Sequence, residues 1–416
     1  MKIDDLYTLY AQEYKVDTDT RNIRKNSLFF ALKGANFNGN EFAEQALDKG
    51  ASYVIIDEKK FKVNNKCILV DNVLNTLQEL ANYHRNQLNI PFIALTGSNG
   101  KTTTKELINA VLSKKYKTVA TKGNLNNHIG VPLTLLSIRL DTEIAIVEMG
   151  ANHQNEIAFL SSIVEPDFGY ITNFGKAHLE GFGSVEGVIK GKSELYDFLI
   201  ENNKSVFINP DDKIQVAKTR NAKRIPFNES ISFLEANPYV KLSFNNTILQ
   251  SKLIGSYNYN NIAAAITIGN YFNVEKDQII NAIQSYSPTN NRSQIIEKND
   301  LKIILDAYNA NPSSMNAALD NLSLLNDVSK IAILGDMFEL GTDSEYEHQS
   351  IVNLARDKGL HAIFIGKQFF NTDANERYEF FEDFISSFNI EKYRNSTILI
   401  KGSRGMALER ILNYIN

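Results

Sequence analysis

A lysine and three threonines, Lys101 to Thr104, follow directly after the glycine-bounded loop "TGSNG" of residues 96–100. The two glycines let the backbone curl around an oxyanion, and the N–H groups and dipole of a helix start attract negative charge. Lys101 adds a full positive charge, and the Thr102 hydroxyl can face a magnesium ion. The general pattern G-x-x-x-x-G-K-[ST] would need glycine at position 95, where the chain has Leu95, so the loop is a shorter G-x-x-G-K-T form. These residue types indicate a site for the phosphates of a nucleoside triphosphate.

The alternative is a glycine-rich turn in front of an ordinary lysine-bearing helix. An apolar strand pattern before the loop, a helical pattern after it and the Lys-Thr pair in phase favour the phosphate site. We therefore expect the loop and the first helical turn to contact nucleotide through Gly97, Ser98, Asn99, Gly100, Lys101, Thr102 and Thr103.

Polar side chains also stand at the ends of other apolar strand patterns. Glu148 ends "EIAIVEMG", and His178 lies in a glycine-rich loop after the strand pattern of residues 168–174. Ligands bind at the carboxyl edge of open α/β sheets, and a carboxylate there is a natural magnesium ligand beside phosphates. A strand-end glutamate alone is more often a turn or cap residue, and the remaining histidines are interpreted as structural or solvated.

Lys192 lies on a predicted helix, "SVEGVIKGKSELYDFL", that contains Gly187 and Gly191. The two glycines are four residues apart and form a flat face that another backbone or a ligand can approach. From spacing alone, Lys192 is expected to be an ordinary solvated helix lysine.

Two strand patterns near the C-terminus end in polar loops. "DAYNANPSSM" places Asp306, Asn309 and Asn311 at one strand end. "LIKGSRGMALERI" ends another strand in Lys401-Gly402-Ser403-Arg404 and is expected to open a helix, which would be a second anion-binding junction. The planar guanidinium of Arg404 suits a carboxylate.

The elements that must position these residues belong to a chain of 416 residues, which predicts about three domains. With 43% hydrophobic and 22% charged residues the composition is globular, and a net charge of −4 does not suggest a nucleic-acid or anionic-membrane surface. The single cysteine, Cys67, excludes an intramolecular disulfide. The N-terminus lacks the apolar core of a signal peptide, and no run of 18 apolar residues occurs. We expect a soluble, cytoplasmic protein without membrane insertion.

Three α/β segments are predicted, at residues 1–88, 89–287 and 288–416. The first mixes short strands and helices. The second alternates strands and helices, which indicates a mostly parallel sheet covered on both faces, and adds a hairpin at "YVKLSF" and "TILQSKLIG". The third repeats the alternation as a doubly wound, Rossmann-like domain.

The chain resembles the bacterial Mur ligases of peptidoglycan synthesis over essentially its whole length. The resemblance rests on "DTR", "NSLFFALKGANFNGNEF", "TGSNGKTTTKE", "GNLNNHIGVP", "VEMGANHQNEIA", "TNFGKAHLEGFGS", "YNANP", "GDMFELG" and "KGSR". One departure is Tyr257, where the family more often has histidine, although Asn258 and Asn261 match.

The resemblance implies an ATP-dependent ligase that joins D-alanyl-D-alanine to UDP-N-acetylmuramoyl-tripeptide through an acyl phosphate. It implies an N-terminal UDP-sugar domain, a central ATPase domain and a monomer. Lys101 would screen the phosphates, Thr102 and Glu148 would hold one magnesium ion, and His178 would help hold a second. Lys192 would carry CO₂ as a metal-binding carbamate. Asn258, Asn261 and Asp306 would face the adenosine and Arg292 the phosphates. The UDP-linked peptide would contact Asp19, Thr20, Arg21, Asn126 and Asn127, and the dipeptide would contact Asn309, Asn311, Lys401, Ser403 and Arg404.

Two alternatives remain from the sequence. Folylpolyglutamate synthetases share the phosphate loop and the amide-forming chemistry, but the "DTR…FFALKG" segment has no role there. A P-loop switch protein is the second alternative. The chain lacks a guanine-reading N-K-x-D element. The strands of its C-terminal segment end in polar loops that a simple switch would not need.

Overall fold

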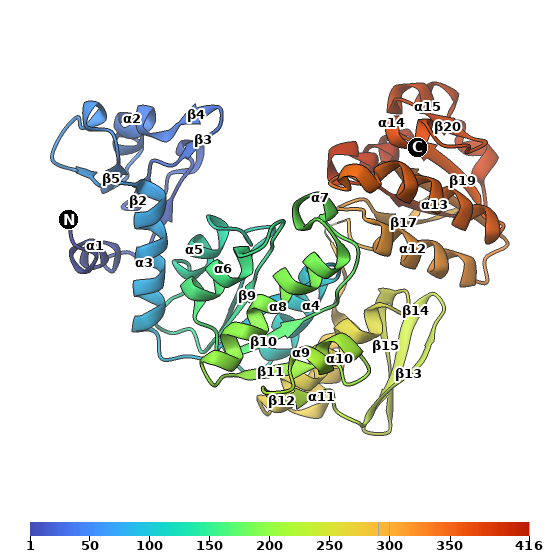
Figure 1. Cartoon of the computed structure of the whole chain (residues 1–416), viewed down its shortest axis with the longest axis horizontal. Coiled ribbons are helices and arrows are strands. Elements are labelled where there is room, and N and C mark those ends of the chain that lie inside the picture. The colour runs from blue at the N-terminus through green and yellow to red at the C-terminus, as the bar shows by residue number, and fades with distance from the viewer. Residues whose placement is uncertain (290, 299, 416) are drawn as a thin grey trace.

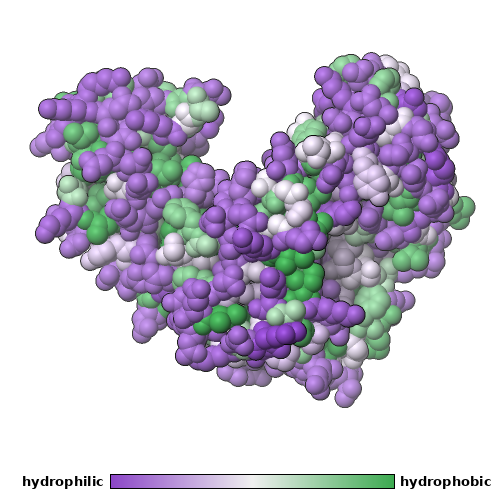
Figure 2. Space-filling model, viewed as in Figure 1, coloured by the Kyte–Doolittle hydropathy of each residue, from purple (hydrophilic) through white to green (hydrophobic). Residues whose placement is uncertain are grey.

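The computed structural model describes residues 1–289, 291–298 and 300–415. Three units follow one another along the chain, each built around its own mainly parallel sheet. The N-terminal unit (blue) and the C-terminal unit (orange to red) stand as two arms above the central unit, as Figure 1 shows. An open space separates the two arms in the space-filling view (Figure 2).

The N-terminal unit is a four-stranded parallel sheet with a small hairpin beside it. The sheet strands, in spatial order, are β1 (Val16–Asp17), β2 (Leu28–Phe30), β5 (Tyr53–Ile56) and β6 (Cys67–Leu69). The hairpin is β3 (Lys33–Gly34) and β4 (Phe37–Asn38), and the helices are α1 (Ile3–Tyr10) and α2 (Ala43–Asp48). The apolar runs predicted as strands are therefore strands, because their side chains pack against α2 on one face and against helix α3 (Val73–Gln87) on the other.

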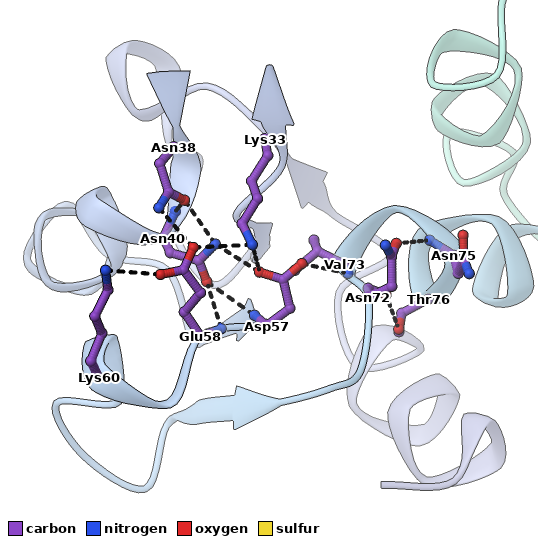
Figure 3. A network of polar contacts seen from close by, with 10 residues as sticks. All are labelled: Lys33, Asn38, Asn40, Asp57, Glu58, Lys60, Asn72, Val73, Asn75 and Thr76. Carbon is purple, nitrogen blue, oxygen red and sulfur yellow. Dashed lines mark hydrogen bonds and ion pairs between the residues drawn. The ribbon is translucent and has the colours of Figure 1, made fainter. Parts of the chain in front are cut away.

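A polar network fixes the hairpin to the end of β5 (Figure 3). Fully buried Asn40 lies at its centre, where its amide donates to Asn38 and Asp57 at 2.9 Å. Lys33 on the hairpin forms ion pairs with Asp57 at 2.9 Å and Glu58 at 3.0 Å. A buried amide is costly unless it is hydrogen-bonded, so this network specifies where the hairpin sits.

Helix α3 connects the N-terminal unit to the central unit. It begins at the Asn72 cap and packs on α1 at one side and on α5 and α6 at the other. Near its end, Arg85 donates to the carbonyl oxygens of Val164 (2.8 Å) and Glu165 (2.7 Å) and lies 4.1 Å over the ring of Phe92. Arg85 therefore anchors the connecting helix to the base of the central sheet.

We expect Arg85→Ala to lower the free energy of unfolding by about 2 kcal/mol or more, because the carbonyl groups it satisfies are left without a charged donor. The measurement is thermal and urea-induced unfolding. The control is Arg356→Ala, which removes a half-exposed ion pair with Asp373 and should change stability by about 0.5 kcal/mol or less. Equal losses in both variants would contradict an anchoring role.

The central unit contains a parallel sheet, as predicted, and this sheet has six strands. Its strands, in spatial order, are β12 (Lys223–Pro226), β11 (Ser205–Ile208), β10 (Phe168–Ile171), β7 (Phe92–Thr96), β9 (Ile144–Glu148) and β8 (Thr118–Ala120). Its helices are α4 (Lys101–Leu112), α5 (Gly130–Leu135), α6 (Glu156–Val164), α7 (Leu179–Phe182), α8 (Val185–Glu201), α9 (Lys213–Lys218), α10 (Asn258–Tyr271) and α11 (Lys276–Ser285). Every residue of β7 and β9 is buried, since helices cover both faces of the sheet.

The predicted hairpin is confirmed as β14 (Tyr239–Phe244) and β15 (Thr247–Ile254), and a third antiparallel strand, β13 (Ile231–Ala236), joins it. The sequence prediction missed β13 because most of this edge strand is exposed and its residues do not alternate between apolar and polar.

The C-terminal unit is a six-stranded sheet in the order β16, β17, β21, β18, β19, β20. The inner strands are β17 (Leu301–Asp306), β18 (Ser329–Gly335), β19 (His361–Ile365) and β21 (Ser396–Lys401), and the edges are β16 (Gln294–Lys298) and β20 (Arg377–Tyr378). The helices are α12 (Pro312–Leu324), α13 (Ser344–Asp357), α14 (Lys367–Phe370) and α15 (Phe381–Ser387). The helix predicted after "KGSR" is wrong as an α-helix: two 3₁₀ helices, Arg404–Met406 and Leu408–Tyr414, meet at Ala407, whose φ of 48° interrupts the helical path.

We propose domain boundaries after residues 88 and 287, between α3 and β7 and between α11 and β16. No helix in the part of the chain that the structure describes is long and apolar enough to cross a membrane.

Candidate active site

The phosphate loop joins β7 to α4 in a conformation that requires its glycines. Gly97 has φ +142°, and a Cβ there would lie 2.0 Å from the Thr172 hydroxyl oxygen. Gly100 caps α4 with φ +79°, and a Cβ there would lie 2.8 Å from Asn261 Oδ1. The Ser98 hydroxyl donates to the carbonyl oxygen of Gly175 at 2.9 Å, and this hydrogen bond ties the phosphate loop to the loop that follows β10.

Lys101 folds back over this loop. Its Nζ donates to the carbonyl oxygens of Gly97 (2.7 Å) and Ser98 (3.2 Å). Burial lowers the pKa of Lys101 to about 8, against the attraction of Glu148. From this position on the loop, the ammonium can move to a bound phosphate. Lys101 and Thr103 both line one cleft.

Glu148, at the end of β9, is buried beside the start of α4. Its Oε1 accepts hydrogen bonds from the Thr102 hydroxyl at 3.2 Å and from the Asn126 amide at 2.8 Å. Its Oε2 is buried and accepts no hydrogen bond from the described residues, while Lys105 Nζ lies 3.9 Å away. A carboxylate oxygen without a hydrogen-bond donor beside a threonine hydroxyl fits a magnesium ion that completes its shell with phosphates and water.

The donor set is sparse in protein ligands. Among residues 1–289, 291–298 and 300–415, no group of three or more His, Cys, Asp or Glu side chains is arranged to hold a metal. Lys105, whose side chain is 3% exposed, was not predicted to lie beside Glu148. In the sequence, a second lysine one turn into a helix resembles an ordinary surface residue.

The expectation that Lys192 is solvated is wrong. Lys192 is fully buried, and its Nζ donates to the carbonyl oxygen of Ala151 at 2.8 Å and lies 5.0 Å from the centre of the Phe182 ring. Phe182 packs on the glycine face of α8, where a Cβ on Gly191 would lie 2.5 Å from the ring. Burial, with a smaller repulsion from Lys101, holds the pKa of Lys192 well below its ordinary value.

His178 caps the short helix α7 with a φ of 54° and lines the same cleft as the phosphate loop. Its Nδ1 is hydrogen-bonded to the carboxylate of Glu339 in the C-terminal unit. This hydrogen bond holds the pKa of Glu339 below its ordinary value. Glu339 was not predicted as a site residue, although it lies in the quoted motif "GDMFELG".

Asn258 and Asn261, at the start of α10, are buried behind the phosphate loop. Asn261 donates to Asn258 Oδ1 at 2.8 Å and accepts from the Thr104 hydroxyl at 3.0 Å. Asn258 donates to the carbonyl oxygen of Ile254 at 2.8 Å. Both residues line the cleft, and Asn261 lies directly against Gly100 of the phosphate loop.

Asp306 and Lys401 form a nearly buried ion pair of 2.6 Å at the carboxyl ends of β17 and β21. Lys401 also donates to the carbonyl oxygen of Asn309 at 3.1 Å. Two arginines stack on Tyr308 between these strands: Arg292 lies 3.8 Å from the ring centre and Arg404 5.0 Å.

The "YNANP" loop contacts the phosphate loop directly. Asn311 caps α12, and its amide donates to Asn99 Oδ1 at 2.8 Å. The Ser403 hydroxyl accepts from the backbone N–H of Phe338 at 2.9 Å. Asn311 therefore joins the two units rather than lying free beside Arg404, which is exposed.

A cleft of about 680 Å³ brings most of the predicted residues together. Its lining includes the phosphate loop, Glu148, His178, Asn258, Asn261, Arg292, Asp306, Asn309 and Lys401, together with Asn126 and Asn127. The site residues predicted in the N-terminal unit, Asp19, Thr20 and Arg21, do not line this cleft. They lie on the N-terminal arm, where Arg21 forms an ion pair with Asp19 at 2.7 Å. The oxygen of the Asn127 amide accepts from Gly130 N at 2.8 Å at the start of α5.

The fold and this cleft define a multidomain P-loop enzyme whose nucleotide site faces a second α/β unit. Family models for the "Mur ligase family, catalytic domain", the "Mur ligase middle domain" and the "Mur ligase, glutamate ligase domain" match residues 14–90, 95–269 and 291–404. The chain belongs to the Mur ligase family.

Individual relatives match over almost the whole chain. The UDP-N-acetylmuramoyl-tripeptide–D-alanyl-D-alanine ligase of Bacillus subtilis is 35% identical, covering 95% of this chain and 92% of the relative. The ligase of the same name from Escherichia coli is 34% identical over 96% and 93%. A crystal structure of MurF from Acinetobacter baumannii has a TM-score of 0.85 at 29% identity, covering 96% of this chain and 93% of that one.

Proposed function

We propose that this chain is an ATP-dependent ligase that joins D-alanyl-D-alanine to UDP-N-acetylmuramoyl-tripeptide in peptidoglycan precursor synthesis. The relatives that match it end to end carry that name. The observation that carries the proposal is the single cleft in which the phosphate loop meets the strand-end loops of the C-terminal unit. A ligase needs this arrangement because it must bring an ATP-activated acid to an amine, whereas a switch protein does not.

The reaction begins with transfer of the γ-phosphate to the terminal carboxylate of the UDP-linked peptide. The amine of the dipeptide then attacks the acyl phosphate, and phosphate leaves. Two anions must approach each other in the first step, so catalysis depends on charge neutralisation and positioning. Lys101 and Arg292 supply positive charge there. The nucleoside lies against Asn258 and Asn261, and Asp306 keeps Lys401 at its edge.

Thr102 and Glu148 would hold one magnesium ion, and His178 and a carbamate of Lys192 would hold a second. The free carboxylate oxygen of Glu148 supports the first assignment. The buried amine of Lys192 supports the second, because only an unprotonated amine combines with CO₂ and burial disfavours the protonated form. Bound magnesium would neutralise phosphate charge during transfer.

The UDP-linked peptide would span the open space between the arms, with its nucleotide on Asp19, Thr20 and Arg21. Asn126 would meet the same substrate near Glu148, beside Asn127. We infer a monomer, because one chain supplies the whole cleft, and a cytoplasmic location, because ATP and UDP-linked precursors are made there.

The test is a ligation assay with purified protein, ATP, magnesium, UDP-N-acetylmuramoyl-tripeptide and D-alanyl-D-alanine, followed by product mass. An amide product, formed with one ADP per bond, is expected. ATP hydrolysis without that product, or stimulation by a folate instead, would contradict the proposal.

Arg404 is expected to hold the dipeptide carboxylate so that the amine, rather than water, meets the acyl phosphate. Arg404→Lys should raise KM for D-alanyl-D-alanine about tenfold and leave KM for ATP nearly unchanged, because lysine keeps the charge but loses the bidentate fork. Steady-state kinetics with each substrate varied in turn measures this. A rise in KM for ATP alone would assign Arg404 to the nucleotide site, with Arg292 on the same tyrosine ring.

A further inference from the structure

The loop that carries His178 belongs to the central unit but is held by the C-terminal unit. Lys176 forms an ion pair of 2.6 Å with Glu347 on α13. The backbone N–H of Glu180 donates to the carbonyl oxygen of Glu339 at 3.1 Å. Figure 1 shows α7, which follows His178, at the point where the two units meet. The position of this loop therefore depends on contacts from the C-terminal unit.

The hydrogen bond between His178 and Glu339 fixes more than the position of the loop. A carboxylate only accepts hydrogen bonds, so Nδ1 of His178 carries the hydrogen, and whenever the ring binds a metal its lone pair is on Nε2. Nε2 forms no hydrogen bond with another described residue, and the ring lines the cleft that contains the phosphate loop. This is the tautomer that a metal ligand needs.

We propose that Glu339 is a positioning residue that presents Nε2 of His178 to a divalent cation in the cleft. The inference rests on the proposed function, which places the second magnesium ion at His178. A carboxylate behind a ligating histidine orients the ring and raises its basicity, and removing it costs about 10- to 100-fold in metal affinity. Because His178 and Glu339 belong to different units, the cation site is complete only when the C-terminal unit is docked as it is here.

The experiment measures Mn²⁺ binding to the full chain in the presence of a non-hydrolysable ATP analogue, by the loss of the free-ion paramagnetic resonance signal. Wild type should bind two ions. Glu339→Ala should weaken one of them about 10- to 100-fold and leave the other unchanged. Glu339→Gln, whose amide oxygen still accepts from Nδ1, should retain most of the affinity. Equal losses in the two variants, or no loss in Glu339→Ala, would overturn the proposal.

Glu347→Gln is the matched control, because it removes the other interdomain ion pair of this loop without touching the ring. Its Mn²⁺ affinity should stay within about twofold of wild type, since the amide oxygen of glutamine can still accept a hydrogen bond from Lys176 and the His178 ring keeps its carboxylate. A loss as large as that of Glu339→Ala would mean that docking alone sets the affinity. A double-mutant cycle gives a second check: in a His178→Ala background, Glu339→Ala should cause no further loss.

The outcomes separate this inference from the proposed function. If wild type binds two ions and His178→Ala weakens one, while Glu339→Ala behaves as wild type, only the role of Glu339 is wrong. If wild type binds one ion, or forms no amide product, the proposed second metal site or the proposed function is wrong, and the role of Glu339 with it.

Discussion

Lys101→Ala is expected to reduce the turnover of the ligation reaction about 10²- to 10³-fold. The ammonium donates to carbonyl oxygens of the phosphate loop, and removing one preorganised electrostatic group from a site of phosphate transfer has an effect of this size. Steady-state kinetics at saturating ATP and magnesium gives the turnover number. The affinity for ATP should fall as well, because the same charge faces the bound phosphates.

The variant must also be shown to fold. Lys101 is partly exposed and lines the cleft, so water can replace its ammonium at the loop, and its loss should leave the melting temperature within a few degrees of wild type. Lys114→Ala is the matched control, since this exposed lysine follows the same helix and its amine donates to Asn281 at 2.9 Å, away from the cleft. Near-normal ligation by Lys101→Ala would contradict the assignment of Lys101 to the phosphates of ATP.

Local signals account for what the sequence predicted correctly. The phosphate loop was predicted because its glycines, lysine and threonine lie within a few residues of one another, between a strand and a helix. The strand ends at Glu148 and Asp306 were predicted because each follows an apolar run that a buried parallel strand needs. The edge strand β13 has no such run and was missed.

Contacts between distant residues could not be predicted. Glu339 is 161 positions from His178, and Asn311 is 212 positions from Asn99, so only the docking of two units brings these pairs together. Their residue types indicate that these positions are polar, but they do not indicate which residue each one contacts. The sequence placed the dipeptide beside Asn311, whereas its side chain is occupied by the phosphate loop.

Lys192 shows how a prediction from the residues of one helix fails when residues outside that helix bury the side chain. The glycine face of α8 was recognised, but nothing in the helix says that Phe182 fills it and covers the neighbouring amine. A fully buried lysine whose amine donates one hydrogen bond, to a backbone carbonyl, is costly as a cation. Resemblance to a family supplied the proposed role, and burial, which disfavours the protonated amine, supports the proposed carbamate.

Lys192→Ala is accordingly expected to abolish ligation to the limit of detection. If the carbamate is a metal ligand, the variant lacks the anionic group that holds the second magnesium ion. Added short carboxylates such as acetate or propionate should restore part of the activity by occupying the vacated position. Product formation measured against carboxylate concentration gives the size of the rescue.

Wild type provides the control for the modification itself. Depleting dissolved CO₂ at alkaline pH should lower its activity, and returning bicarbonate should restore it. Mass spectrometry of the native protein can detect the mass that CO₂ adds to the chain as a carbamate. Lys192→Arg should not be rescued by bicarbonate, because a guanidinium stays protonated and does not form a carbamate. If Lys192→Ala retained activity, or if wild type were insensitive to CO₂ removal, the buried amine would serve the fold through its bond to Ala151 rather than the chemistry.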